Sequence, residues 1–417
     1  MRPLSRRQLL GAAAATALVP DVVRAAGAAR PAGTWLAGDF HCHTVYSPDV
    51  WGGPGDDKPT EPEPDKLGHT PAEQIAQATV RGLDFLAITD HNRVDALRDP
   101  GYRSDDLVLV PGYEHTLPRS DHSGVFMPSV AALPDVIPST RGTKAWLAEI
   151  HDRGGMAIVN HPYYGDETAG DTLMWDVGLA ETTRFDAVEV WNSMWLTRHE
   201  TTPFYEPDNH LAVRWWERVH RRAAVGASDN HWRILAGVAG VGQPTTWVYA
   251  PRADAAGVIA GVRAGRTTIS WQPPNLGGPF LTLDVVEEWS KKAAMVGGAV
   301  HAEGPLLAVA TTRNAHGMRL RLVSGGTDVV HESHVTGDRT EVPVVLPAGG
   351  WLRAELLMEE RNALTALTSC VRAAGRAPAR VRREPTRGKP LTYDGSGFAF
   401  LAPPAVINAP SCPCAHA

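Results

Sequence analysis

Short apolar runs alternate with amphipathic segments over the first two thirds of the chain. Apolar runs of about four to eight residues indicate buried strands, and apolar positions spaced by about three or four residues indicate helices. We expect strands at 35–40, 83–89, 106–113, 156–160, 185–190, 223–227 and 245–250, and helices at 71–81, 143–153, 211–222 and 253–264. Strands that alternate with helices are typical of a parallel β/α architecture.

The clearest element boundary lies at Thr70. Thr70 is followed by Pro71 and then by Glu73, which is the pattern of a capping box with proline at the first helical position. Gly82 follows the last periodic residue and predicts the end of this helix. The segment 50–68 before it is rich in glycine, proline and acidic residues, and we expect a surface loop there.

Beyond Gln272 the pattern changes to strict alternation. Residues 318–322 and 352–356 alternate between apolar and polar side chains, and 280–286, 306–311 and 342–346 are further short apolar runs. With no clear helix between them, these runs predict a small antiparallel β-sandwich of roughly seven strands. The basic segment 361–389 is rich in alanine, proline and arginine, and we expect a long loop.

The N-terminal segment has the features of a targeting sequence. Arg6 and Arg7 precede an apolar run at 11–19, and small residues follow at 25–29. This pattern resembles a twin-arginine (Tat) export signal, which implies an exported bacterial protein, periplasmic or extracellular, that the Tat machinery carries. The apolar run is too short and too alanine-rich to span a membrane, so we expect no membrane span in the mature protein. We therefore divide the chain into a signal (1–30), a domain of alternating strands and helices (31–272), a β-sandwich-like domain with a basic loop (273–410) and a tail (411–417).

Composition narrows the functional classes only slightly. The chain has 417 residues, of which 43% are hydrophobic and 21% charged, with a formal net charge of −6. This is ordinary globular composition, and such mild acidity gives no reason to expect a nucleic-acid partner. The four cysteines, Cys42, Cys370, Cys412 and Cys414, are not spaced as a disulfide framework.

Metal-binding residue types recur where the predicted strands end. His41 and His43 share one side of an extended segment, and Asp229 and His231 repeat that spacing. The complete set has six imidazoles and three carboxylates: His41, His43, Asp49, His91, Glu114, His122, His161, Asp229 and His231. Because the C-terminal ends of barrel strands meet at one rim, this pattern favours a β/α barrel over an open doubly wound sheet. No glycine-rich dinucleotide loop follows the first strand.

Such a ligand set has a chemical preference. Mixed imidazole and carboxylate ligands suit zinc, manganese or iron rather than magnesium or calcium. The set is large enough for two or three divalent ions with a shared carboxylate, and clustered ions are suited to hydrolysis by metal-bound hydroxide. Taken singly, each of these residues also has an ordinary interpretation, as a hydrogen-bonded strand-end cluster or as a surface-loop residue.

Several motifs together resemble the PHP (polymerase and histidinol phosphatase) superfamily, in that family's order. They cover roughly residues 35–272 and comprise His41-Cys42-His43-Thr44 with Ser47 and Asp49, the run from Gly82 to Asn92, Pro111 to Glu114, Asn160-His161-Pro162 and Gly226 to His231. The export signal, the strand at 245–249 and the C-terminal β region resemble more loosely the CehA/McbA branch of metallohydrolases.

The PHP resemblance implies a distorted (β/α)7 TIM-like barrel with up to three ions. By that resemblance, the first ion takes His41, His43, Glu114 and Asp229, the second takes Glu114, His122 and His161, and the third takes Asp49, His91 and His231. Glu114 would then bridge two ions. Position 49 is Asp where some members have His, and His122 lies in a less standard setting.

Other residues near these motifs have weaker claims. We expect Glu114 and His231 to take part in catalysis, and Arg93 to contact an anionic substrate. Glu189 and Asn192 are candidates for substrate contacts or for supporting the ligands, whereas His115 and Trp191 more often pack.

The sequence thus predicts an exported metal-dependent hydrolase acting on a small phosphoester. A carbamate or carboxylic ester hydrolase of CehA/McbA type is the alternative enzyme. A non-catalytic exported protein that binds a metal or another ligand is the alternative from a different class.

Overall fold

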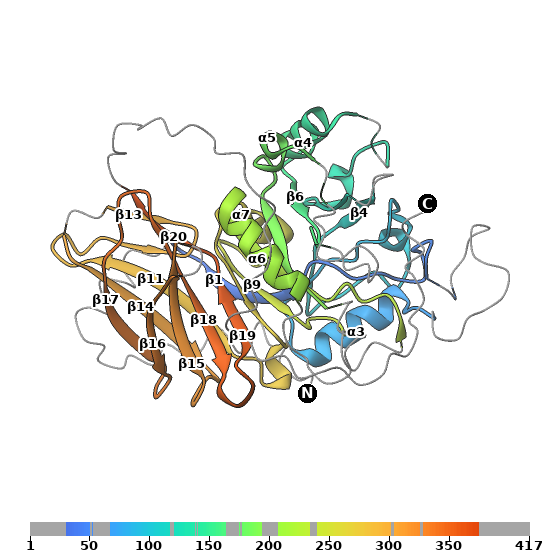
Figure 1. The fold of residues 1–417 in the computed structure, drawn as a ribbon. Helices are drawn as coiled ribbons and strands as arrows, with labels where there is room; N and C mark the ends of the chain where they lie inside the picture. Colours follow the sequence, from blue (N-terminus) through green and yellow to red (C-terminus); the bar gives the residue numbers. More distant parts are fainter. Residues whose placement is uncertain are drawn as a thin grey trace.

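A computed structural model describes the two regions of regular structure. The described residues are 31–50, 52, 67–116, 121–137, 139, 141–163, 175, 177–193, 207–233, 240–301, 304–325 and 328–374. The predicted export signal, most of the predicted loop 50–68 and the tail from 375 onward, including Cys412 and Cys414, lie outside them. Figure 1 shows the C-terminal strands, coloured yellow to red, gathered at one end of the molecule, with the N-terminal sheets at the other.

One five-stranded sheet carries most of the predicted site residues. Its order is β4-β5-β6-β7-β8, and its strands are Gly112–Thr116, His122–Phe126, Met156–Val159, Ala187–Asn192 and Ala223–Ala227. Strands β6, β7 and β8 run parallel, but β4, β5 and β6 pair antiparallel.

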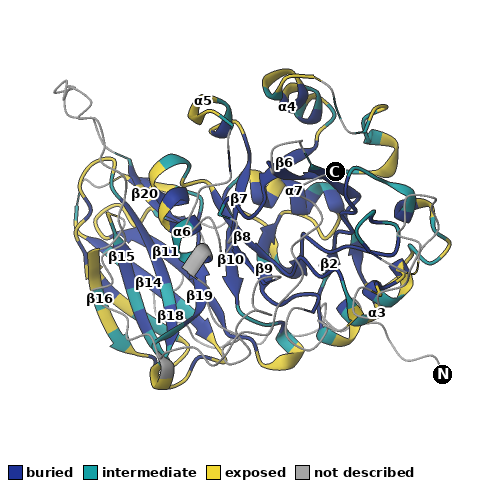
Figure 2. Cartoon of the chain, turned by 45° about the vertical axis from the view of Figure 1, so that its right-hand side comes forward, coloured by how far each residue is buried: buried dark blue, intermediate teal, exposed yellow. Residues whose placement is uncertain are grey.

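A second run of strands begins with three parallel neighbours, β1 (Thr34–Asp39), β2 (Phe85–Leu86) and β3 (Val108–Leu109). On the other side of β1, the strands β9 (Thr245–Ala250) and β10 (Thr267–Ser270) add in antiparallel fashion. Figure 2 shows β2, β9 and β10 buried along most of their length.

Two isolated bridges join the two runs where the strands end. Cys42 pairs with Asn230, and His91 pairs with Glu114, both in parallel sense. The backbone N–H of Asp229 donates to the carbonyl of His41 at 2.8 Å. The end of β1 therefore lies beside the end of β8, and the end of β2 lies beside β4.

The predicted (β/α)7 barrel is not confirmed in its details. The described strands do not close into one hydrogen-bonded barrel, and the β4–β5–β6 pairs and β9 break the predicted parallel order. The strand predicted at 106–113 is two strands, β3 and β4. His122, which the pattern places in a loop, begins β5. The sequence of β5 has no apolar run, because His122, Ser123 and Gly124 occupy its first three positions. Glycine is required at 124, since a Cβ there would come within 2.7 Å of the Phe126 ring.

The helices cover the sheets, and α3 fulfils its sequence prediction. Thr70 accepts from the backbone of Glu73, the Glu73 side chain accepts from the backbone of Thr70, and Gly82 ends the helix with a φ of 79°. The helices are α3 (Pro71–Arg81), α4 (Thr143–Asp152), α5 (Leu179–Thr182), α6 (Pro207–Val219) and α7 (Ala255–Arg263). Short 3-10 turns are η2 (Asp95–Arg98), η3 (Val130–Ala132), η6 (Pro274–Leu276) and η7 (Glu359–Arg361). Among the described residues, no helix has the length and apolarity needed to cross a bilayer.

The C-terminal region is built from strands in two sheets that share one apolar core. Leu283, Ala308, Leu322 and Leu356 are among its fully buried residues. The strands are β11 (Phe280–Glu287), β12 (Ala293–Met295), β13 (Ala299–His301), β14 (Leu306–Arg313), β15 (Arg319–Ser324), β16 (Asp328–His334), β17 (Arg339–Val344), β18 (Trp351–Met358), β19 (Ala363–Thr368) and β20 (Val371–Ala374). The loop predicted at 361–389 is wrong over its first part, because β19 and β20 lie there.

The two regions are continuous in hydrogen bonding. Strand β10 pairs antiparallel with β19, so one sheet runs from the N-terminal region into the C-terminal one. A buried ion pair adds to this connection, with Arg353 of β18 donating to Glu217 of α6 at 2.5 Å.

Candidate metal centre

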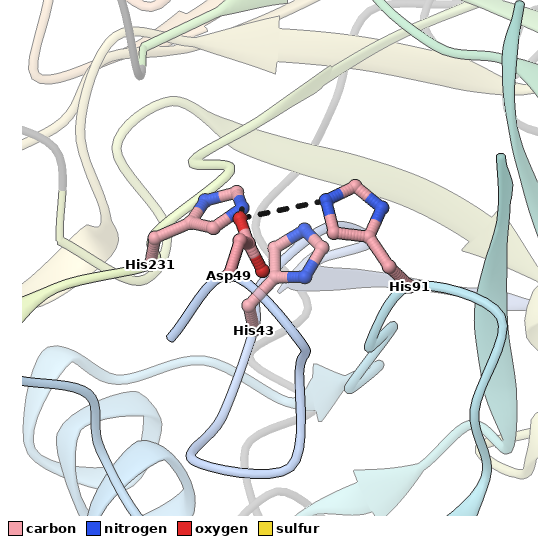
Figure 3. Close-up of side chains that lie close together, drawn as sticks. All are labelled: His43, Asp49, His91 and His231. Atoms are coloured by element: carbon pink, nitrogen blue, oxygen red, sulfur yellow. Dashed lines mark ion pairs between the residues drawn. The ribbon is translucent and has the colours of Figure 1, made fainter. Parts of the chain in front are cut away.

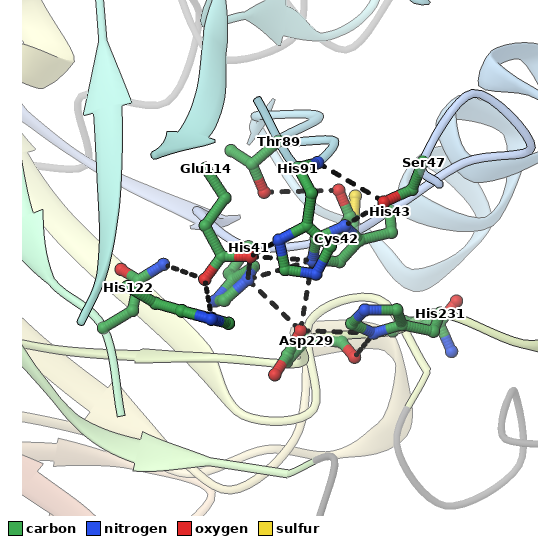
Figure 4. Close-up of polar contacts among 12 residues, drawn as sticks. His41, Cys42, His43, Ser47, Thr89, His91, Glu114, His122, Asp229 and His231 are labelled. Carbon is green, nitrogen blue, oxygen red and sulfur yellow. Dashed lines mark hydrogen bonds and ion pairs between the residues drawn. The ribbon is translucent and has the colours of Figure 1, made fainter. Parts of the chain in front are cut away.

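The strand ends bring the nine predicted ligand residues into one cluster. His41 and His43 follow β1, His91 follows β2, Glu114 lies in β4, His122 begins β5, His161 follows β6, and Asp229 and His231 follow β8. Figure 4 shows most of these side chains directed toward one another. All of the nine except Asp49 are buried residues, and the Asp49 side chain is 7% exposed.

The backbone is unusual at two of these positions. Asp229 has a φ of 51° and His161 a φ of 21°, whereas side chains other than glycine rarely adopt positive φ. Such conformations concentrate at functional sites, where the surrounding structure holds them in place. At Asp229, the hydrogen bond from its N–H to His41 fixes this turn.

The first group of donor atoms consists of His41, His43, Asp229 and Glu114. His41 Nε2 lies 3.1 Å from His43 Nε2 and 3.2 Å from both Asp229 Oδ1 and Glu114 Oε2. His43 Nε2 lies 3.3 Å from Asp229 Oδ1 and 3.4 Å from Glu114 Oε2. In a tetrahedral zinc site with bonds of about 2.0–2.1 Å, the ligand atoms are about 3.3–3.4 Å apart. The five distances are close to this spacing. His41 and His43 form one candidate group with Asp229, whereas Glu114 groups with His41 and His161.

The outward nitrogens of both histidines have fixed partners. His41 Nδ1 lies 3.0 Å from Glu189 Oε2, and His43 Nδ1 lies 3.1 Å from Ser47 Oγ. If Nδ1 donates in each case, Nε2 presents its lone pair to the cluster. A carboxylate or hydroxyl behind a histidine is the usual support of a metal-binding imidazole.

The second group contains Asp49, His91, His231 and His43 (Figure 3). Asp49 Oδ2 lies 2.9 Å from His231 Nε2 and 3.6 Å from His91 Nε2. His231 Nδ1 lies 2.9 Å from the carbonyl oxygen of Asp229 and can donate to it, which again leaves Nε2 facing inward. Three of these residues are those that the sequence resemblance assigns to the third ion.

Glu114 lies where the groups meet. Its Oε2 faces His41, His43 and His91, at 3.2, 3.4 and 2.9 Å from their nearest ring nitrogens. Its Oε1 accepts from Asn160 Nδ2 at 2.8 Å, and it lies 3.1 Å from His122 Nδ1 and 3.4 Å from His161 Nε2. A carboxylate with imidazoles on both oxygens has the geometry of a bridging ligand.

The set predicted for the second ion is only partly assembled. Glu114 groups with His41 and His161 on one side and with His91 and His122 on the other, rather than with His122 and His161 together. The rings of His122 and His161 nevertheless lie close, with centroids 5.0 Å apart. Both histidines reach the cluster, on different sides of the same carboxylate.

Opposite charges dominate the electrostatics of the cluster. Burial alone would raise the pKa of Glu114, but His41, His122 and His91 hold that pKa well below its ordinary value. Burial also disfavours the charged form of His231 and would lower its pKa, but Asp49 and Asp229 raise that pKa to about 9. These shifts show that the carboxylates need positive charge beside them.

Three candidate ligand atoms of the cluster are buried without a hydrogen bond. Within the described residues, Glu114 Oε2, Asp229 Oδ1 and His231 Nε2 make none, although imidazole or carboxylate atoms lie near each. Buried polar atoms of this kind are normally satisfied, and leaving one unsatisfied costs about 1–3 kcal/mol or more if charged. All three atoms face the inside of the cluster. Together with the mixture of nitrogen and oxygen ligand atoms, this fits a divalent zinc, manganese or iron ion.

Arg93 and His115, which were also singled out in the sequence, lie outside the cluster. Arg93 Nε donates to Asp95 at 3.1 Å, and the Arg93 side chain is 32% exposed. His115 Nε2 accepts from the backbone of Ser139 at 3.2 Å, and its ring packs on Trp146. The placement of Arg93 leaves its role toward an anionic substrate a prediction.

Apart from Asn192, the sequence did not assign a role to the neutral residues that hold the ligands. Ser47 and Asn160 occur within quoted motifs, but only the structure shows their contacts with His43 and Glu114. Thr116 Oγ1 lies 2.7 Å from His91 Nδ1. Asn209 of α6 had no signal in the sequence, because it contacts the site only through the backbone of Asn192 at the end of β7.

Comparison with known proteins gave matches in structure only. No protein-family model matches the sequence, and no curated protein sequence does so. The chain is similar to a two-domain protein from Bacteroides vulgatus that contains a predicted PHP-like metal-dependent phosphoesterase, with 17% identity, 82% of this chain and 97% of that chain covered, and a TM-score of 0.43. It is also similar to PsfC from Pseudomonas syringae, with 18% identity, 58% and 93% covered, and a TM-score of 0.40.

A more distant likeness is to the lesion-specific endonuclease EndoQ from Pyrococcus furiosus, with 12% identity, 55% of each chain covered and a TM-score of 0.34. All these identities and TM-scores are low. Structures similar to this chain thus include one that contains a predicted PHP-like metal-dependent phosphoesterase.

Proposed function

We propose that this protein is a metal-dependent hydrolase that acts on a small phosphoester. The observation that carries the proposal is the convergence of two groups of donor atoms on Glu114, whose Oε2 is buried without a hydrogen bond. His41, His43, Asp229 and Glu114 would hold one ion, and Asp49, His91 and His231 another. His122 and His161 would contribute to a further position at Glu114.

When bound, divalent ions would lower the pKa of a coordinated water and polarise the scissile group. The chain's own residues supply orientation and charge. Glu189 and Ser47 hold His41 and His43 by their outward nitrogens, so both rings present Nε2 to the same point. We assign His231 to the ligand set rather than to proton donation, because its Nδ1 is directed to a carbonyl and its Nε2 faces Asp49.

Several adjacent cation positions support the choice of a phosphoester. Paired ions stabilise both the attacking and the leaving oxygen of an in-line displacement at phosphorus. A carbamate or carboxylic ester hydrolase of CehA/McbA type is the alternative, since the same ions polarise a carbonyl. A non-catalytic metal-binding protein is the remaining alternative.

The test compares substrates and variants. Metal-loaded protein is assayed on p-nitrophenyl phosphate, p-nitrophenyl acetate and an aryl methylcarbamate. We expect metal-dependent release of p-nitrophenol from the phosphate, lost by more than about 100-fold in Glu114→Gln, since this removes a ligand rather than an outer partner. His115→Gln is the matched control, because the neighbouring His115 packs on Trp146 outside the cluster.

Each other outcome has a clear meaning. Hydrolysis of the carbamate or the acetate but not of the phosphate would contradict the phosphoester proposal and favour the carbamate or carboxylic ester alternative. Turnover of none of the three, with undiminished stability after chelation, would contradict the enzyme proposal.

We also propose export by the Tat route, supported by the twin arginines Arg6 and Arg7. In a bacterial host, the wild-type protein should reach the periplasm. Replacing both arginines by lysine should retain it in the cytoplasm, and unchanged fractionation would contradict the proposal.

A further inference from the structure

Asn192, at the end of β7, donates to two carboxylates at once. Its Nδ2 lies 2.6 Å from Glu189 Oε1 and 3.0 Å from Asp229 Oδ2. All three side chains are buried, with Asn192 only 1% exposed. One amide group therefore joins carboxylates from two neighbouring strands.

Each of these carboxylates acts on the first group of donor atoms. The other oxygen of Glu189 lies 3.0 Å from His41 Nδ1. The other oxygen of Asp229 lies 3.2 Å from His41 Nε2 and 3.3 Å from His43 Nε2. The direction of the Asn192 amide thus affects Asp229 directly and His41 through Glu189.

An irregularity in β7 brings Glu189 and Asn192 to the same side. Residues three apart on a regular strand face opposite sides. Here Glu189 pairs with Val225, but Trp191 pairs with the next residue, Gly226, so β7 contains one extra residue. Such a bulge re-aims the side chains that follow it, and bulges are common beside active sites.

The backbone of Asn192 is itself held at two points. Asn209 Oδ1 accepts from the Asn192 N–H at 2.9 Å, and Asn209 Nδ2 donates to the Asn192 carbonyl at 2.9 Å. This pairing occurs within a buried part of the protein, since Asn209 is 6% exposed. Helix α6 therefore fixes the position from which the Asn192 amide points.

We propose that Asn192 is a positioning residue of the metal centre. Its amide orients the ligand Asp229 and, through Glu189, the ligand His41. An amide suits this role because it supplies two N–H donors without a charge that would compete with the ion. The inference rests on the metal centre of the proposed function and not on the identity of the substrate.

The test measures metal binding rather than turnover. Metal-free wild-type protein, Asn192→Ala and Asn209→Ala are titrated with Co²⁺, whose visible absorption reports the number and arrangement of its ligands. Loss of a residue that supports a metal ligand typically weakens affinity by about 10–100-fold. We expect that loss for Asn192→Ala together with a changed cobalt spectrum, and a smaller loss for Asn209→Ala.

Thr268→Ala is the matched control. Thr268 is fully buried, and its hydroxyl donates to the carbonyl of Leu367 at 3.0 Å, away from the cluster. The control should lose stability but keep the cobalt affinity and spectrum of the wild type. If Asn192→Ala does not fold, Asn192→Ser, which keeps one donor, should fold with an intermediate affinity.

Two results would overturn the inference. One is wild-type affinity and spectrum in the Asn192 variant that folds. The other is an equal loss in Thr268→Ala, which would mean that general destabilisation explains the effect. Wild-type protein that binds no Co²⁺ would instead contradict the metal centre itself, whereas wild-type protein that binds Co²⁺ but hydrolyses no ester would contradict only the proposed activity.

Discussion

Replacing Ser47 by alanine should weaken the binding of two ions at the same time. The Ser47 hydroxyl is fully buried and donates to Asp49 Oδ1 at 2.8 Å. It also lies 3.1 Å from His43 Nδ1, and it accepts from the backbone N–H of His91 at 3.3 Å. One oxygen atom therefore supports a ligand of the first group and two ligands of the second.

The size of the effect follows from these contacts. A hydrogen bond to an ionised carboxylate contributes about 1.5–3 kcal/mol, and a neutral one about 0.5–1.5 kcal/mol. Each metal ligand that loses its outer partner typically costs about 10–100-fold in affinity, or about 1.4–2.7 kcal/mol per ion. We expect two of the binding steps of Ser47→Ala to weaken by this amount.

Stepwise calorimetric titration of metal-free protein with Zn²⁺ measures each step separately. Ser270→Ala is the control, because Ser270 is also buried and its hydroxyl accepts from Trp247 Nε1 at 3.1 Å and donates to the carbonyl of Gln272 at 3.0 Å. The control should keep every wild-type affinity. Wild-type affinities in Ser47→Ala, or the weakening of a single step, would refute the shared support.

Three further predictions concern pH, the connection between the regions, and packing. The pKa of His231 is raised to about 9 in the metal-free protein. The stability that its charge contributes is complete below its ordinary pKa of about 6.5 and is lost as the pH rises through about 9. The gain in Tm on adding Zn²⁺ should therefore increase from pH 6 to pH 9, and a constant gain would contradict this. Glu217→Leu should lower the free energy of unfolding by about 1–3 kcal/mol in urea titration, because it removes one carboxylate partner of the buried Arg353 and leaves Glu355. An unchanged urea midpoint would show that the Arg353–Glu217 ion pair does not contribute to stability. Gly38→Ala should cost about 1–3 kcal/mol in thermal unfolding, because its Cβ would overlap the Phe85 ring. A wild-type Tm would mean that the ring moves aside.

The residue types and local spacing were enough to predict the members of the cluster. His41 and His43 share a strand side, and Asp229 and His231 repeat that pattern, so both pairs could be recognised without knowledge of the fold. The structure brings all nine predicted ligand residues together, although their ligand roles stay a proposal. Asn192 was a candidate for supporting the ligands, but the sequence did not show which carboxylates it contacts. Ser47 and Asn209 were harder to assign a role, because a neutral side chain has no distinctive pattern.

The topology was only partly predictable for a related reason. Alternating strands and helices predict a parallel sheet, and β6, β7 and β8 follow that rule. Strand β5 pairs antiparallel with both neighbours. It was not predicted as a strand, because His122, Ser123 and Gly124 interrupt the apolar pattern. Capping chemistry at Thr70 is local, and that prediction was confirmed in detail.

The metal content of the protein tests the central claim most directly. Protein purified from cells without added metal is analysed for zinc, manganese and iron, beside Glu114→Gln and the control His115→Gln. We predict two or three ions per wild-type chain, the same in the control, and at most one in Glu114→Gln. A wild-type chain without these metals, or full occupancy in Glu114→Gln, would contradict a centre built around a shared Glu114.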